Sequence, residues 1–576
     1  MTKPSTSAKP ASSTPVAAGE QPALEALRTT LMASAGALLG AAEAGDAKAA
    51  DKRGGITLER PPRADFGDYS TNAALLLAPR LKAPPREVAE RLGVQLAADL
   101  GSSLERFEVA GPGFLNLFVA DTWLRSGLAG LLSAGDSYGV ATDGPAERVM
   151  VEFVSANPTG PMHVGHARNA AYGDSLARML VLRGSRVERE FYVNDAGSQV
   201  RTFGASIQAL ARGEQAPEDG YQGDYVAELA GRIPDAASAD VGEVGRAAVA
   251  MMIEEIKASL ASFGVGGFDY WAYESALHEG ERSLVDRALE RLGELGHTYT
   301  LDGALWLRST AFGDDKDRVL VRSNGEFTYL ASDVAYHEDK RERGFDRLIN
   351  VWGADHHGYV VRLKAAYAAL GGDPETLELL IMQLVHLVRS GERAQMSKRS
   401  GEFVTLDELV AEIGVDAARW YLLARSHDTT VDLDLDLARS QSAENPVYYV
   451  QYAHARIASV LDKAGEQRVE EAVRQAMAQA SEEAAEPLHA SERALIEQLL
   501  DFPVELASAT ARRAPHRLAA YALELAQGFT AFYRDCRVVG AEPRSVESQR
   551  IALCVAGKRT IALCLDLLGV SAPEHM

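Results

Sequence analysis

The chain has 576 residues, of which 47% are hydrophobic and 24% are charged, and its formal net charge at pH 7 is −22. This length is too great for one hydrophobic core, so we expect several domains. The negative charge excludes general affinity for nucleic acid, but it allows a specific RNA to be held on a local basic face. No apolar run is long enough for a membrane-spanning helix, so no membrane partner is expected.

The first 22 residues are a low-complexity segment rich in Ser, Thr, Pro and Ala. Such a composition cannot bury a core, so residues 1–22 are predicted to be a disordered tail. The segment lacks the apolar stretch of a secretory signal and contains no Arg, which favours a plain tail over a targeting sequence.

The cysteines are Cys536, Cys554 and Cys564, and they form no Cys-x-x-Cys pair. They are predicted to be buried thiols of a cytoplasmic protein, because disulfides are rare in the reducing cytosol. A structural zinc held by cysteines is excluded by their spacing.

Residues 23–120 are predicted to form a small α+β domain. The stretch 24–44 has helical apolar spacing, and a Gly-Asp turn precedes a second helix whose end is marked by Pro79 and Pro84. The stretch 107–120 is predicted to contain two strands around a Gly-Pro-Gly turn.

Residues 121–440 are predicted to form an α/β domain with a Rossmann-like parallel sheet. Strand-like runs alternate there with helical stretches, which indicates βαβ units, and the runs are 149–154, 187–193 and 348–351. A mostly helical insertion is expected at 198–317, followed by a hairpin around Asn324-Gly325.

From Asn445 the pattern is helical to the end, so residues 441–576 are predicted to be an all-α bundle. An exposed helix and connector rich in Glu, Gln and Ala is expected first, over 464–492. Further helices are expected at 492–511, 515–534 and 545–569.

The stretch 151–174, VEFVSANPTGPMHVGHARNAAYGD, contains the most informative pattern. An apolar strand turns through Pro and Gly residues and continues as a helix that begins with His163, Gly165 and His166. A helix N-terminus presents free N–H groups to an anion, and two imidazoles three residues apart share one face. Gly165 has no side chain, so a flat ring can lie against the backbone there. The pattern indicates a site that holds the triphosphate of ATP while a carboxylate attacks the α-phosphorus.

A second segment, AQMSKRSGEFVTLDEL at 394–409, lies far downstream and carries Met-Ser-Lys. Together with SANPTGPMHVGHARN, REFYVNDAG, WGADHHGY, NPVYYVQYAHAR and LDLLGVSAPEHM, the pair resembles bacterial arginyl-tRNA synthetases, which are class I aminoacyl-tRNA synthetases. The resemblance covers the chain from about Leu24 to Met576. It implies that the first domain contacts tRNA, that the α/β domain is catalytic and that the helical bundle binds the anticodon.

The resemblance implies that ATP is bound by His163, Gly165, His166, Met396, Ser397 and Lys398. Of these, the two histidines and the lysine are expected to be catalytic. A Lys ammonium on a Gly-flanked loop can move onto the triphosphate and neutralise the charge that builds on the leaving pyrophosphate. The family usually has a second Lys before the Met, where this chain has Gln395. One expected charge is therefore missing, and Arg399 is the candidate to supply part of it.

A substrate guanidinium requires carboxylates in planar, bidentate geometry. Tyr329 and Asp333 are four residues apart and would share a helix face, and the resemblance assigns this pair to the guanidinium, with Glu274 as a second carboxylate. Residues just before the HVGH turn are expected at the carboxyl end of a strand, where they would face the α-amino and carboxylate groups of arginine; these are Glu152, Ser155 and Asn157. Taken singly, each acid is more typical of a surface or capping residue.

The segment WGADHHGY places Asp355, His356 and His357 in succession, and all three are residue types that bind metal ions. Adjacent residues at a strand end point in opposite directions, so these three cannot easily bind one ion, and no metal site is predicted. The resemblance instead places Gly353 and Asp355 at the ribose of ATP, and His356 near the substrate arginine.

Tyr448, Tyr452 and Arg456 repeat at intervals of four residues in one predicted helix. They are either an aromatic core stripe or a stacking face for splayed anticodon bases, for which aromatic and Arg side chains are the usual partners. The resemblance assigns further tRNA contacts to Phe114, Asn116 and Met576. For Phe114 a core position is an equally good interpretation.

The resemblance implies that the chain joins L-arginine to tRNA(Arg) through arginyl-adenylate. ATP would enter with Mg²⁺ as a substrate complex, without a tightly bound metal, and activation would require bound tRNA. No symmetric interface is evident, so a monomer is the default expectation. The alternatives are another HxGH nucleotidyltransferase that adenylylates a small metabolite, which the long helical C-terminal region disfavours, and a non-enzymatic RNA-binding relative, which the retained His163, Lys398 and Asp333 disfavour.

Overall fold

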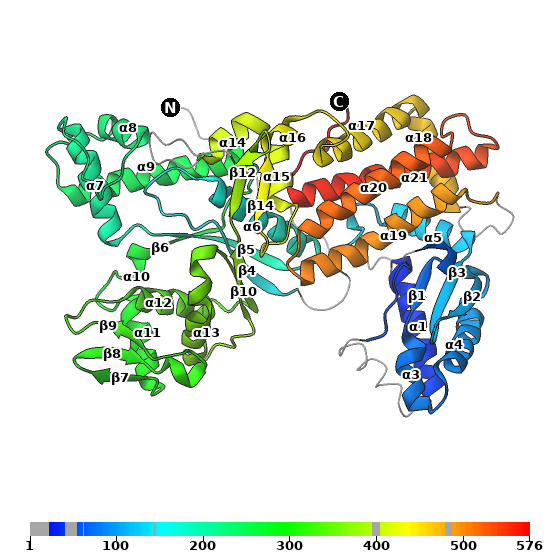
Figure 1. The fold of residues 1–576 in the computed structure, drawn as a ribbon, viewed down its shortest axis with the longest axis horizontal. Coiled ribbons are helices and arrows are strands. Elements are labelled where there is room, and N and C mark those ends of the chain that lie inside the picture. The colour runs from blue at the N-terminus through cyan, green and yellow to red at the C-terminus, as the bar shows by residue number, and fades with distance from the viewer. Residues whose placement is uncertain (1–21, 41–54, 62, 142–145, 394–403, 479–485) are drawn as a thin grey trace, which may run out of the picture. The chain divides into compact units, whose positions relative to one another are not determined.

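The computed structural model describes residues 22–40, 55–61, 63–141, 146–393, 404–478 and 486–576 (Figure 1). Nearly all of the predicted tail at 1–22 lies outside these ranges. The chain forms two compact units. The first comprises 1–144, 464–504 and 536–556, and the second comprises 145–463, 505–535 and 557–576.

The first unit contains the predicted α+β domain, drawn in blue in Figure 1. Its antiparallel sheet has the order β1-β3-β2, formed by Tyr69–Thr71, Phe114–Val119 and Leu104–Ala110. The predicted Gly-Pro-Gly turn joins β2 to β3, and the helices are α1 (Ala23–Leu39), α3 (Ala73–Leu81), α4 (Pro85–Leu100) and α5 (Asp121–Ala134). The helix end falls between Pro79 and Pro84, as expected: Pro79 lies in the last turn of α3, which stops at Leu81, where Lys82 adopts the left-handed conformation.

The second unit is built on a five-stranded parallel sheet with the order β11-β10-β4-β5-β6. The strands are β4 (Arg148–Glu152), β5 (Arg186–Val193), β6 (Tyr270–Tyr273), β10 (Arg347–Gly353) and β11 (Leu377–Met382). The three predicted strand-like runs are β4, β5 and β10, so the expected parallel α/β fold is confirmed. Val149, Met150 and Val151 are fully buried because both faces of β4 are covered, which explains its continuous apolar run.

The expected insertion begins as predicted, with α7 (Gly197–Ala211), α8 (Asp224–Arg232) and α9 (Val241–Ser262). The sheet resumes earlier than expected, because β6 lies within 198–317 and pairs with β5, placing Tyr270 opposite Glu190. A four-residue strand carries too little periodicity to be recognised in sequence.

A smaller antiparallel sheet, β7-β8-β9, follows β6. The elements of this region are α10 (Glu274–Leu277), α11 (Leu284–Glu294), β7 (Thr298–Leu301), β8 (Ala304–Leu307), β9 (Arg318–Val321) and α12 (Tyr329–Glu342). The chain turns at Asn324-Gly325 as predicted. The returning arm pairs only at Phe327, which bridges to Val321, because α12 starts two residues later.

The rest of the second unit's α/β region contains α6 (Val164–Leu182), α13 (Val360–Ala369) and a three-stranded sheet of the order β13-β12-β14. That sheet consists of Glu392–Arg393, Val385–Arg389 and Val431–Asp434, and it is accompanied by α14 (Leu406–Ile413), α15 (Val415–Leu423) and α16 (Leu435–Arg439).

The C-terminal region is helical, as predicted. Its helices are α17 (Pro446–Ala464), α18 (Glu466–Ala478), α19 (Ala490–Ala511), α20 (His516–Asp535) and α21 (Arg544–Leu568). The two units divide this region between them, since α20 belongs to the second unit and α18 to the first. The expected domain boundary at residue 440 therefore does not coincide with a unit boundary.

The cysteines are buried and form no disulfide, as predicted. Burial raises the pKa of Cys554 to about 12, so this thiol stays protonated at pH 7. Among the described residues, no helix is long and apolar enough to span a membrane.

Candidate active site

The carboxyl ends of the parallel strands gather the predicted substrate residues. Glu152 ends β4, Glu274 follows β6, and Gly353 ends β10. From β4 the chain adds β5 and β6 on one side of the sheet, and it later places β10 and β11 on the other side. The strand order therefore reverses between β4 and β10. Ligands of open parallel sheets bind at such a switch point, outside the carboxyl ends of the strands.

The HVGH segment forms the N-terminus of α6, as predicted. His163 is the N-cap: its Nδ1 accepts the N–H of Gly165 at 3.1 Å, and His166 Nδ1 accepts the N–H of His163 at 3.3 Å. The two rings stack with their centroids 3.7 Å apart. Because each Nδ1 is an acceptor, Nε2 of each neutral ring carries the proton. A Cβ at Gly165 would lie 2.9 Å from His163 Cε1, so any larger residue here would press on the His163 ring.

Burial lowers the pKa of both histidines. For His166 the pKa falls to about 3, with the neighbouring His163 as a second cause. Both rings are therefore neutral at pH 7, and they can serve a phosphate as hydrogen-bond donors but not as positive charges.

The turn that leaves β4 is strained. Val154 and Ser155 have φ angles of 69° and 41°, in the left-handed region that costs a non-glycine residue about 1–3 kcal/mol. Asn169 of α6 holds this turn, since its Oδ1 accepts the N–H of Val154 at 2.7 Å and its Nδ2 donates to the carbonyl of Val351 at 2.9 Å. Sequence reasoning missed this residue, although an Asn in the second turn of a buried helix was an available signal.

Two of the predicted guanidinium residues, Asp333 and Glu274, lie close to Tyr192 of β5. Asp333 is half-buried in α12 and accepts a hydrogen bond from the hydroxyl of Tyr359. Burial raises the pKa of Asp333 to about 6, and burial together with the Asp333 charge raises that of Glu274 to about 7. Tyr329, one turn before Asp333, is 69% exposed. Two neighbouring carboxyls with raised pKa values form a site that a cation would ionise and bind.

Glu152 and Ser155 are hydrogen-bonded to each other, and Asn157, two residues after Ser155, is exposed. Glu152 Oε1 accepts from Ser155 Oγ at 2.9 Å, and Ser155 Oγ accepts the N–H of Tyr192 at 3.2 Å. The second oxygen of Glu152 pairs with the buried ammonium of Lys340. Glu152 therefore has both oxygens engaged within the protein, which sequence reasoning did not anticipate.

The predicted ribose residues follow β10. The Asp355 carboxylate lies close to Gly353, since a Cβ at that glycine would be 2.7 Å from Asp355 Oδ1. Asp355 and His356 are exposed in the short helix Ala354–Tyr359, and the His356 ring lies 5.4 Å from that of Trp352.

The segment with Gln395, Met396, Ser397, Lys398 and Arg399 lies outside the described residues. The chain that follows this segment is hydrogen-bonded to the HVGH turn. The carbonyl of Val404 accepts the N–H of Val164 at 3.2 Å, and the N–H of Leu406 donates to the carbonyl of Met162 at 2.7 Å.

The predicted stripe on α17 lies at the surface and not in the core. Tyr452 is 41% exposed, its ring stacks on that of Tyr448 with centroids 6.3 Å apart, and its hydroxyl accepts from Arg456. The guanidinium of Arg456 also lies 5.8 Å from the ring of Tyr533 on α20, a residue that sequence reasoning missed. The C-terminal Met576 of the same unit is 54% exposed.

The two candidate tRNA residues of the first unit differ. Phe114 is 40% exposed, so it is available for a contact. Asn116 is only 3% exposed, and its Oδ1 accepts from Ser70 Oγ on the paired strand β1 at 2.8 Å. Asn116 is therefore largely covered and bonded to the neighbouring strand, and its contact with tRNA stays a prediction.

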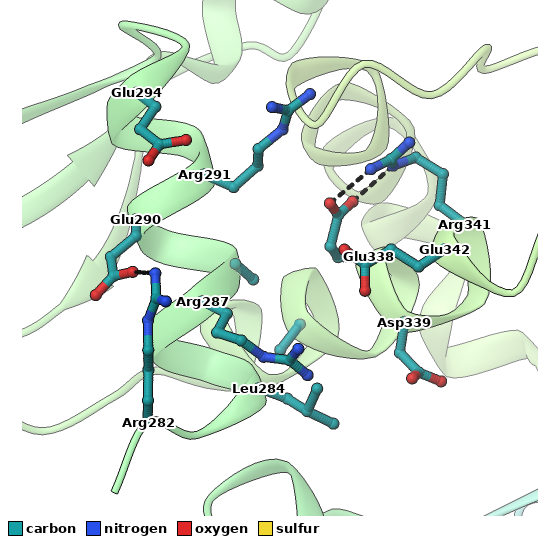
Figure 2. A pocket seen from close by; sticks show the side chains of 12 residues that line it. Arg282, Leu284, Arg287, Glu290, Arg291, Glu294, Glu338, Asp339, Arg341 and Glu342 are labelled. Atoms are coloured by element: carbon teal, nitrogen blue, oxygen red, sulfur yellow. Dashed lines mark hydrogen bonds and ion pairs between the residues drawn. The ribbon is translucent and has the colours of Figure 1, made fainter.

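A polar groove, here called the outer groove, lies between α11 and α12 (Figure 2). It is lined by charged residues, and none of the predicted substrate residues is among them; they include Arg287, Arg291, Glu338, Asp339, Arg341 and Glu342. Within the described part of the chain, no group of three or more His, Cys, Asp or Glu side chains is placed to hold a metal ion.

Family models match most of the chain. The arginyl tRNA synthetase N terminal domain matches residues 37–119, and the catalytic domain of tRNA synthetases class I (R) matches 128–229 and 274–459. The DALR anticodon binding domain matches 450–576.

Arginine–tRNA ligases are among the similar curated proteins. That of Geobacillus kaustophilus is 46% identical over 92% of this chain and 95% of its own length. That of Bacillus subtilis is 44% identical over 90% and 94%. Among solved structures, a putative arginyl-tRNA synthetase from Campylobacter jejuni aligns with a TM-score of 0.72 at 33% identity, over 80% of this chain and all of that one. The Thermus thermophilus arginyl-tRNA synthetase aligns with a TM-score of 0.71 at 26% identity, over 93% and 99%. This chain therefore belongs to the arginyl-tRNA synthetase family of class I aminoacyl-tRNA synthetases.

Proposed function

We propose that the chain is an arginine–tRNA ligase that works through arginyl-adenylate at the carboxyl ends of β4, β6 and β10. The arginine carboxylate attacks the α-phosphorus of ATP, and pyrophosphate leaves. The terminal ribose hydroxyl of tRNA then attacks the carbonyl carbon of the adenylate, and AMP leaves. The observation that carries the proposal is the pair of raised-pKa carboxyls, Asp333 and Glu274, in the same cluster of strand ends as the HVGH turn.

Catalysis in this proposal is positioning and electrostatic stabilisation, without a covalent enzyme intermediate. His163 and His166 donate from Nε2 to the triphosphate, and the N-terminus of α6 adds its dipole. Because both rings are neutral, positive charge must come from elsewhere, which assigns it to Lys398 and to the Mg²⁺ that accompanies ATP. Lys398 lies six residues before Val404, and six residues span at most about 20 Å.

The remaining assignments follow the same scheme. Gly353 and Asp355 contact the ribose, and His356 faces arginine. Glu152, Ser155 and Asn157 form the wall beside the α-amino and carboxylate groups. The stripe of Tyr448, Tyr452 and Arg456 stacks on tRNA bases. We place the enzyme in the cytoplasm as a monomer.

Pyrophosphate exchange tests the reaction. Exchange should depend on arginine, should require tRNA, and should be at background with lysine, because an ammonium cannot make the bidentate contacts of a guanidinium. Exchange driven by another amino acid, or adenylylation of a small metabolite without tRNA, would overturn the proposal.

The charge on the Met-Ser-Lys segment can be tested by a double-mutant cycle. Lys398→Ala should be severe, and Gln395→Lys should be neutral or mildly activating, because it adds a cation beside a developing anion. Arg399→Ala should lower the activation rate more in the natural sequence than in a Gln395→Lys background, since the two cations would be partly redundant. Strictly additive effects would show that Arg399 does not replace the missing lysine.

The stripe on α17 should contribute to tRNA binding. Tyr452→Ala should raise the KM for tRNA roughly tenfold, because stacking of one base on an aromatic ring contributes about 1–3 kcal/mol. The KM values for arginine and ATP at saturating tRNA should stay unchanged. Tyr299→Ala, which removes a tyrosine from the small sheet, is the control. Equal KM values for tRNA in the two variants would exclude α17 from the interface.

A further inference from the structure

Lys340 of α12 is the one lysine that the structure buries fully among the described residues, and its exposed fraction is 0%. Its Nζ lies 2.5 Å from Glu152 Oε2 on β4, 3.3 Å from Asn350 Oδ1 on β10 and 3.9 Å from the ring centroid of Tyr336. A buried ammonium is costly unless it is paired and hydrogen-bonded. Here its two hydrogen-bond partners, Glu152 and Asn350, belong to the two strands that flank the switch point of the sheet.

On the β4 side, Lys340 reaches the turn that leads to HVGH. It fixes one oxygen of Glu152, and the other oxygen accepts from Ser155 Oγ at 2.9 Å. Ser155 has a φ angle of 41° and, together with Val154, forms the strained turn after β4. The ion pair therefore holds a residue whose backbone would otherwise relax.

On the β10 side, Lys340 reaches the backbone of Asp333. Asn350 Nδ2 donates to His337 Nε2 at 3.0 Å, and His337 Nδ1 donates to the carbonyl of Asp333 at 2.8 Å. Burial lowers the pKa of His337, so the ring is neutral and has one acceptor and one donor nitrogen, as both contacts require.

Acidic groups outnumber the buried ammonium around Tyr192. Glu152, Asp333, Glu274 and Asp195 all lie close enough to the Tyr192 hydroxyl to raise its pKa, after burial as the main cause. Lys340 pairs with only the first of these. The ammonium therefore neutralises Glu152 and leaves Asp333 and Glu274 for an incoming guanidinium.

We propose that Lys340 is a positioning residue for arginine activation. Its ammonium fixes the Glu152 carboxylate and the Ser155 turn on one side and the backbone of α12 at Asp333 on the other, so that Asp333 meets the guanidinium while the arginine carboxylate meets ATP. This inference rests on the arginine site proposed above.

A purely structural role makes a different prediction, because a buried ion pair can often be replaced by neutral groups without loss of stability. If Lys340 only fills space, removing both charges should restore both stability and activity. If it positions Glu152, stability should return without activity.

The test uses Lys340→Met, Glu152→Gln and the double variant, with Arg341→Met as a control. Arg341 is the next residue of α12, but it lines the outer groove and pairs with Glu338 there (Figure 2). The melting temperature, kcat and the KM values for arginine and ATP are measured by pyrophosphate exchange in the presence of tRNA.

Lys340→Met should lower the melting temperature and raise the KM for arginine at least about tenfold, because it leaves Glu152 buried and unpaired. The double variant should recover the melting temperature while its KM for arginine stays at the level of Glu152→Gln. The KM for ATP should change less than about twofold in each, and Arg341→Met should resemble the unchanged enzyme.

Recovery of the arginine KM in the double variant, or additive losses in the cycle, would overturn the inference. The double variant also decides the question if Lys340→Met does not fold. The proposed function fails separately: in that case the unchanged enzyme would show no exchange that depends on arginine.

Discussion

His163→Asn is expected to lower kcat at least about a hundredfold while leaving the melting temperature unchanged. Asn is a favoured N-cap, so its Oδ1 can still accept the N–H of Gly165 that His163 Nδ1 now accepts. What the variant lacks is the outer Nε2–H, and removing one such donor to a transition state typically costs a factor of about 10²–10³. His163→Ala should lose the same activity and, in addition, some stability, because it removes the cap as well.

His166→Ala should show the same loss of kcat, since its ring stacks on that of His163 and presents the same edge. Single-turnover formation of the adenylate is the decisive measurement, because it excludes effects on product release. Near-normal rates in well-folded His163→Asn and His166→Ala would remove the pair from the mechanism.

The local patterns of the sequence were enough to predict this part of the site. The HVGH turn depends on a strand, a Pro-Gly turn and a helix start that are contiguous in the chain, and the helix face of Tyr329 and Asp333 depends on a spacing of four residues. The parallel sheet could be predicted because apolar runs alternate along the chain with helical stretches. A strand that is buried on both faces, such as β4, is apolar throughout and does not alternate with polar residues.

Features that depend on contacts distant in sequence could not be predicted in this way. Lys340 and Glu152 are 188 residues apart, and a lysine in a polar helix such as α12 is ordinarily assigned to the surface. The left-handed conformation of Val154 also could not be predicted, because a β-branched residue rarely adopts a positive φ angle. The burial of Asn116 and its hydrogen bond from Ser70 on the neighbouring strand are likewise visible only in the fold.

The proximity of Asp333 and Glu274 also depends on contacts that are distant in sequence. One lies in α12 and the other in α10, and their shared neighbour Tyr192 comes from β5. The resemblance implies a role for both acids, but their raised pKa values depend on how the elements pack. Burial is the main cause for each, followed by the charge of Glu152 for Asp333 and by the charge of Asp333 for Glu274.

Asp333→Asn should raise the KM for arginine about a hundredfold and leave that for ATP nearly unchanged. Loss of one partner from a desolvated charge pair costs roughly 2–5 kcal/mol, and 1.4 kcal/mol corresponds to about a tenfold change. Asn keeps an oxygen that can accept from Tyr359, so the fold around it should survive. Glu342→Gln, which removes a carboxylate from the outer groove of the same helix, is the matched control. Equal changes in both KM values would assign Asp333 a structural role instead.

The raised pKa of Asp333 predicts opposite effects of pH on arginine binding and on the stability of the substrate-free protein. Burial raises the pKa of Asp333 to about 6, so protons compete with arginine for this carboxyl, and the KM for arginine should rise as the pH falls from about 7.5 to 5.5. Groups that face Asp333 and shape this profile are Glu152, Glu274, Tyr359, His356 and Lys340.

For stability, a folded-state pKa above the unfolded value means that the folded protein binds more protons, so its stability falls as the pH rises toward 6 and stays reduced above it. Asp333→Asn should therefore lose arginine affinity at pH 8 but keep or gain melting temperature there when no substrate is present. A variant that lost both would show that the Asp333 carboxylate stabilises the fold, and that the raised pKa does not reflect a site held ready for a cation.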